Sequence, residues 1–265
     1  MTTSQPREPL PGTAPEAAPE PVGRPCEFPP HRWGFGAFLL VEAVLLASAA
    51  FVSVLVGDPA PGRPLPIRTV LLGTMLPAMI AAGVAVLATR VRGNGPVIDL
   101  RLRWRWADVK TGLKFGLLGL VLTSLGAYVW TELVGDADAT SAISALIDDR
   151  KMSVPAAVVM FVYLWLAGPI CEEIIYRGLL WGAVERLRWR SERFGRIAAF
   201  VLSTAVFAAG HLEPLRTTLL LVIAVPIGLA RLVTGRLAGS VVAHAVNNFL
   251  PAVTILLGAL GVSSF

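Results

Sequence analysis

Three apolar stretches of this 265-residue chain carry ionisable or amide side chains whose types could act together in chemistry. Charged side chains at the centre of a bilayer cost about 2.5–3.5 kcal/mol each on insertion scales, so each such group in an apolar stretch is a candidate functional residue. The candidates are Glu172, Glu173 and Arg177 in the first stretch, His211 in the second, and His244 and Asn248 in the third.

Helical spacing sorts these side chains into pairs. Glu173 and Arg177 are four residues apart and therefore meet on one helical face, where we expect an ion pair that supports the helix. His244 and Asn248 have the same spacing and lie one above the other. Asn247 is rotated by about 100° from Asn248 and is expected to be a bystander.

The residue types favour hydrolysis by an activated water. A carboxylate and a histidine can hold a water and remove its proton. A second histidine, with an amide one turn away, offers donors for the oxyanion that forms on an attacked carbonyl. This set would cleave a peptide bond without a nucleophilic serine or cysteine. Two histidines and a carboxylate are also a ligand set for a catalytic zinc ion, and the residues alone leave both possibilities open.

The composition requires these groups to sit in a membrane protein. Hydrophobic residues make up 55% of the chain and charged residues only 15%, against about 25% charged in a soluble domain. The net charge of +5 fits basic cytoplasmic loops, so no nucleic-acid partner is expected. The class is therefore an all-α, polytopic bundle of transmembrane helices.

The chain divides into a proline-rich tail at 1–32, expected to be disordered, and a helical membrane domain at 33–265. About seven spans are predicted, with six to eight as the range, since each crossing needs about 20 apolar residues. A kink is expected at Gly168-Pro169, and the segment 97–110 is expected to lie on the lipid headgroups, with a short strand as the alternative. The spans are 34–56, 69–89, 112–134, 154–185, 197–212, 217–234 and 238–261.

The distribution of basic residues predicts the orientation of this bundle. With seven spans, the loops on the N-terminal side hold 16 lysines and arginines and the opposite loops hold five. The positive-inside rule then places the N-terminus in the cytoplasm and the C-terminus outside the cell membrane. At 1.5 Å per residue, the catalytic candidates lie roughly 12–22 Å from the nearest cytoplasmic arginine, so they can meet at one depth.

The order of these motifs resembles a known family. Glu172-Glu173-x-x-Tyr176-Arg177, Phe207-x-x-x-His211 and His244-x-x-x-Asn248 are similar to the three motifs of the type II CAAX prenyl endopeptidase and bacteriocin-processing (CPBP, or Abi) family of intramembrane proteases. The resemblance covers about 155–250.

The resemblance implies an intramembrane endopeptidase with a role for each motif residue. Glu172 would be the base that activates water, His211 would hold that water, and His244 with Asn248 would stabilise the oxyanion. Glu173, Arg177, Tyr176 and Phe207 would support the site, the last two as walls of the pocket. No cofactor is certain; a divalent metal such as zinc, if present, would be bound by Glu172, His211 and His244.

The expected partners are membrane lipids and a peptide or membrane-protein substrate, with or without a lipid modification. Two other functions remain open. One is a non-catalytic bacteriocin-immunity or scaffold protein, because the family includes proteins assigned to immunity. The other is a proton-coupled transporter, because buried carboxylates and histidines also relay protons; the inverted repeats typical of that class are not found in the sequence.

Overall fold

The computed structural model describes residues 32–56, 66–135 and 152–261. Apart from Arg32, the predicted tail at 1–32 lies outside the described residues. Within the described ranges the structure is built from helices and contains no strand, which confirms the all-α class.

Seven helices are long and apolar enough to cross a membrane in the part of the chain that the structure describes, as predicted. The fourth crossing, Val154–Glu185, has the predicted bounds, and the others differ from prediction by a few residues at their ends. The protein is therefore a multi-pass membrane protein. The other six crossings are made by α1 (Phe35–Val56), α2 (Ile67–Arg92), α4 (Trp106–Val134), α10 (Glu192–Gly210), α11 (Thr217–Thr234, preceded by the short η3, Pro214–Arg216) and α12 (Leu237–Ala259).

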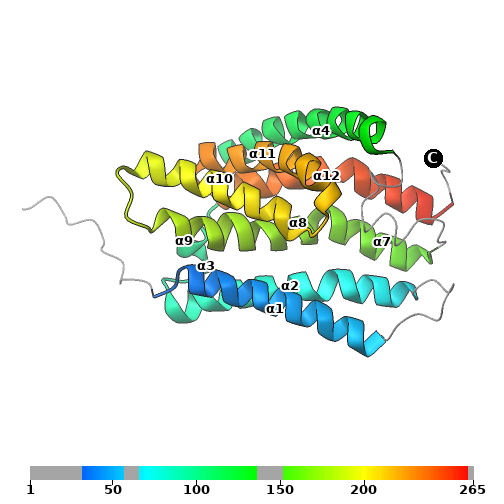
Figure 1. The fold of residues 1–265 in the computed structure, drawn as a ribbon, viewed down its shortest axis with the longest axis horizontal. Coiled ribbons are helices and arrows are strands. Elements are labelled where there is room, and N and C mark those ends of the chain that lie inside the picture. The colour runs from blue at the N-terminus through cyan, green and yellow to red at the C-terminus, as the bar shows by residue number, and fades with distance from the viewer. Residues whose placement is uncertain (1–31, 57–65, 136–151, 262–265) are drawn as a thin grey trace, which may run out of the picture.

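The fourth crossing lies between two groups of helices (Figure 1). The pair α1 and α2 packs on one side of it, and α10 and α12 pack on the other. This central position explains why its motif residues Glu173 and Arg177 are fully buried.

The fourth crossing also contains two π-helical stretches. It runs through α7 (Val154–Val162), the π-helical η1 (Tyr163–Ala167), α8 (Gly168–Glu172), the π-helical η2 (Glu173–Leu180) and α9 (Trp181–Glu185). Wide π turns are uncommon and occur frequently at functional sites. Gly168-Pro169, where a kink is expected, lies directly after η1 and begins α8.

The segment 97–110, which is expected to lie on the lipid headgroups, joins α2 to α4. The short helix α3 (Pro96–Asp99) opens it, and its last five residues form the first turns of α4. The side chains of Trp104 and Trp106 are exposed, as expected at a headgroup layer, whereas Asp99 is buried. The strand alternative is wrong.

A stripe of glycines on α4 brings this helix close to α12. A Cβ atom on Gly112 would lie 2.6 Å from the carbonyl oxygen of Gly239, and one on Gly116 would lie 2.6 Å from the Cβ of Val246. Small residues allow such close approach of helices in membranes. The α4 stripe therefore sets the position of α12, which carries His244 and Asn248.

Candidate active site

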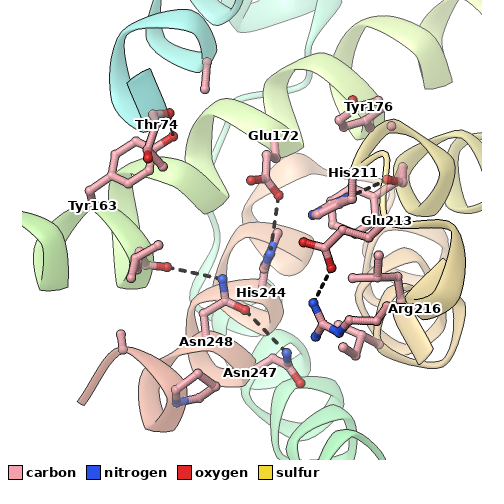
Figure 2. A pocket seen from close by; sticks show the side chains of 18 of the residues that line it. Thr74, Tyr163, Glu172, Tyr176, His211, Glu213, Arg216, His244, Asn247 and Asn248 are labelled. Atoms are coloured by element: carbon pink, nitrogen blue, oxygen red, sulfur yellow. Dashed lines mark hydrogen bonds and ion pairs between the residues drawn. The ribbon is translucent and has the colours of Figure 1, made fainter. Parts of the chain in front are cut away.

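A cavity of about 530 Å³ opens among the motif-bearing helices. Figure 2 shows side chains from α8, α10 and α12 directed toward it. Six predicted site residues line this cavity, and together they include every predicted catalytic side chain: Glu172, Tyr176, Phe207, His211, His244 and Asn248.

Glu172 and His244 lie next to each other on the wall of the cavity. Oε2 of Glu172 lies 3.7 Å from Nε2 of His244, which is too long for a direct hydrogen bond. The Glu172 side chain is 29% exposed, whereas that of His244 is 3% exposed. The carboxylate is therefore open to the cavity, and a water could bridge the two groups.

Glu173 and Arg177 lie behind this wall and do not line the cavity. Nη1 of Arg177 donates to Oε1 of Glu173 over 3.1 Å, and both side chains are completely buried. Nδ1 of His244 lies 3.0 Å from the same carboxylate oxygen. The expected ion pair is present, and it also orients the imidazole of His244.

His211 follows the last residue of α10, and its side chain is held by this helix. Its Nδ1 lies 2.8 Å from the carbonyl oxygen of Phe207, which can only accept, so Nδ1 carries the proton. In the neutral ring, Nε2 is then left with a free lone pair. This nitrogen can accept a hydrogen bond from a water in the cavity.

The ring of Phe207 holds the cluster together. It makes edge contacts with Tyr176, His211 and His244 at centroid distances of 5.5, 4.7 and 5.6 Å. The guanidinium carbon of Arg177 lies 4.1 Å from its centroid. Phe207 thus contacts residues of all three motifs.

Asn248 is bound to the fourth crossing. Its Nδ2 donates to the carbonyl oxygen of Leu164 over 3.2 Å, and its Oδ1 accepts from Nδ2 of Asn247 over 3.4 Å. Asn247 is 2% exposed and lines the cavity. Asn247, which the sequence predicts to be a bystander, therefore lies on the cavity wall, because a residue on the adjacent face of α12 is still enclosed where α4 packs closely.

Sequence reasoning also missed the charged pair Glu213 and Arg216 on the cavity wall, which form an ion pair with each other. These residues lie in the connection between α10 and α11, where the motif pattern gives no signal. Tyr163 and Thr74 line the cavity as well, and the Tyr163 hydroxyl donates to the Thr74 carbonyl oxygen over 2.9 Å.

The donor set fits a metal ion only in part. Both histidines present Nε2 while Nδ1 is bonded to an acceptor, as in metal-binding histidines. However, no three His, Cys, Asp or Glu side chains within the described ranges come together as a metal-binding group. The predicted set of Glu172, His211 and His244 therefore does not form a three-ligand site in this arrangement.

Comparison with protein families agrees with this geometry. Residues 154–250 match the family model described as type II CAAX prenyl endopeptidase Rce1-like. This segment of the chain is therefore similar to Rce1-like domains. The match contains all three motifs and nearly coincides with the predicted 155–250, which confirms the resemblance. No curated protein and no solved structure matches the chain.

Proposed function

We propose that the protein is a CAAX-type intramembrane endopeptidase that hydrolyses a peptide bond with a water activated by Glu172. The observation that carries this proposal is the open Glu172 carboxylate, 3.7 Å from His244, on the wall of a cavity formed by membrane helices. A carboxylate is retained in such a place only when it has a function or a partner.

Activation of the water uses Glu172 and His211. The Glu172 carboxylate takes one proton from the water as the water oxygen bonds to the carbonyl carbon of the substrate. Nε2 of His211 accepts a hydrogen bond from the second O–H of the same water. This bond holds the water oxygen in position to attack the carbonyl carbon. The proton on Glu172 then passes to the amine nitrogen as the carbon–nitrogen bond breaks.

Stabilisation of the oxyanion uses His244 and Asn248. Nδ1 of His244 donates to Glu173, and its Nε2 faces the cavity, where it would contact the oxyanion. The Asn248 amide has two N–H bonds, of which the Leu164 carbonyl takes one. The other is free to donate to the oxyanion, and loss of one such donor costs about 10²–10³ in kcat in other hydrolases.

The substrate we propose is a peptide or a membrane-protein segment, with or without a prenyl group. Apolar side chains make up much of the cavity lining, and the cavity is of the size that takes one ligand of moderate dimensions. Bilayer lipids surround the protein. We also propose that the N-terminus is cytoplasmic and the C-terminus external, from the excess of basic residues in the corresponding loops.

Cleavage of a defined peptide in reconstituted vesicles tests this function. The probe is a farnesylated peptide that ends in a Cys-aliphatic-aliphatic-X sequence, compared with the same peptide without the lipid. We expect wild-type protein to release the C-terminal fragment, identified by mass spectrometry, and Glu172→Gln to lower the rate by about 10³-fold or more.

Glu132→Gln is the matched control, because Glu132 is exposed on α4 and does not line the cavity. This variant should retain the wild-type rate. Full activity of a folded Glu172→Gln protein would contradict the proposed base. If neither form of the peptide is cleaved, the proposal that the protein acts on CAAX-type peptides is contradicted.

A further inference from the structure

A chain of four hydrogen-bonding groups runs through the floor of the cavity from α4 to the fourth crossing. The hydroxyl of Thr123 donates to Oδ1 of Asn247 over 2.8 Å. Nδ2 of Asn247 donates to Oδ1 of Asn248, and Nδ2 of Asn248 donates to the Leu164 carbonyl. Figure 2 shows the bonds that join Asn247 to Asn248 and Asn248 to the fourth crossing. Three separate membrane helices are joined in this way.

The direction of the chain follows from its last member. The Leu164 carbonyl oxygen can only accept, so the nitrogen of the Asn248 amide must face it. The oxygen of Asn248 then faces Asn247, whose own nitrogen must be the donor. This orientation leaves the second N–H of Asn248 available, whereas the opposite orientation would present an acceptor to an oxyanion.

The Leu164 carbonyl is available because of the sequence that follows it. In η1 the Gly168 N–H donates to the Tyr163 carbonyl, five residues earlier. In the same register, the donor to Leu164 would be the N–H of residue 169, but that residue is Pro169, which has none. The π turn and the proline together free one backbone acceptor at the position that Asn248 reaches.

Thr123 is held in place by the glycine stripe of α4. Gly116, Gly119 and Thr123 follow one another at spacings of three and four residues and share a helical face. A Cβ atom on Gly119 would lie 3.3 Å from Oδ1 of Asn247, which shows how closely this face approaches α12. The stripe therefore brings the Thr123 hydroxyl to the Asn247 amide.

From this geometry we infer that Asn247 and Thr123 are positioning residues, which act through Asn248 and fix the direction of its amide. The inference rests on the proposed function, since it assumes that Asn248 stabilises an oxyanion. Asn247 touches no reacting atom in this role. Its effect should appear in kcat and leave KM unchanged, because the amide direction matters most once charge develops on the carbonyl oxygen.

The experiment measures kcat and KM on the farnesylated peptide for single and paired variants. We expect Asn247→Ala to lower kcat about tenfold, a part of the ~10²–10³ that loss of an oxyanion donor costs. Thr123→Val should lower kcat about threefold. Thr123→Ser, which keeps the hydroxyl, should instead have about the wild-type kcat. Thr111→Val is the control on α4, because the Thr111 hydroxyl bonds only to its own helix, at the Ala107 carbonyl.

The decisive comparison is made in the Asn248→Ala background. There, Asn247→Ala should change kcat by about twofold or less, because the amide that it orients has been removed. An equal loss in both backgrounds would overturn the inference, and so would wild-type kcat in Asn247→Ala beside an impaired Asn248→Ala. Wild-type kcat in Asn248→Ala itself would instead remove Asn248 from the proposed mechanism, and this inference with it.

Discussion

Two carboxylates in different parts of the helical bundle have very different surroundings. Asp99 accepts hydrogen bonds from Nε1 of Trp33 at 2.8 Å and from the Asn94 backbone N–H at 3.0 Å, and Nη2 of Arg186 lies 3.7 Å from its other oxygen. Glu172 faces the cavity, with a histidine nitrogen at 3.7 Å. A carboxylate surrounded by donors stabilises the fold, whereas one left open can take a proton.

The same contrast holds between neighbouring residues in the Glu172-Glu173 pair. Glu173 is completely buried against Arg177 and His244, and Glu172 is open to the cavity. Adjacent positions on a helix differ by about 100°, so one carboxylate can face the protein and the other the cavity. The carboxylate of Glu173 thus stabilises the structure, whereas that of the adjacent Glu172 is available for chemistry in the cavity.

The largest effect on stability is expected from Glu173→Gln. This change leaves the buried Arg177 without a countercharge, and breaking a buried ion pair costs about 3–5 kcal/mol. Activity should fall as well, because His244 loses the carboxylate that orients it. Thermal unfolding in detergent and peptide cleavage measure the two effects; wild-type stability would show that the pair has no structural role.

A partner substitution sharpens this prediction. The double variant Glu173→Gln with Arg177→Met removes both charges and should regain much of the lost stability, since replacement of a buried pair by uncharged groups is often neutral. Activity should stay low, because His244 remains without its carboxylate. Recovery of both properties together would mean that Glu173 has no part in orienting His244.

A smaller effect is expected from Asp99→Asn. The variant weakens hydrogen bonds that involve a charged acceptor, each worth about 1.5–3 kcal/mol, and lowers the melting temperature by a few degrees. Arg186, whose guanidinium lies 3.6 Å over the Trp33 ring, remains stacked. Cleavage of the peptide at 25 °C should be unchanged, and a large loss of kcat there would break the contrast between Asp99 and Glu172.

The smallest effect is expected from a metal chelator. Since the described His, Cys, Asp and Glu side chains form no group of three ligands, 1,10-phenanthroline should change the cleavage rate by less than about twofold. The rate is measured after prolonged incubation, with an inert isomer of the chelator as control. Loss of activity that zinc restores would contradict the metal-free mechanism.

Much of the fold could be predicted because the length and hydropathy of each apolar run indicate a membrane span. The bounds of the fourth crossing follow from the apolar run alone, and the i,i+4 spacing predicts the ion pair of Glu173 and Arg177. The joint placement of Glu172, His211 and His244 on one cavity also follows, because costly polar groups in separate spans are satisfied together.

The rest depended on packing between helices that no single segment encodes. The rotation of Asn247 on α12 predicts a bystander, yet the glycine stripe of α4 encloses it beside Thr123. Gly112 and Gly116 were visible in the sequence and could have indicated this contact. Glu213 and Arg216 carried no such signal, because the connection between α10 and α11 follows no periodic pattern.

Direct attack of water on the peptide bond is tested most directly by turnover in ¹⁸O-labelled water with hydroxylamine present. We predict one ¹⁸O atom in the new carboxyl group of the N-terminal fragment, no hydroxamate, and an unchanged protein mass during turnover. A hydroxamate product, or an acyl adduct on a side chain such as the neighbouring Cys171, would show a covalent intermediate and contradict the account.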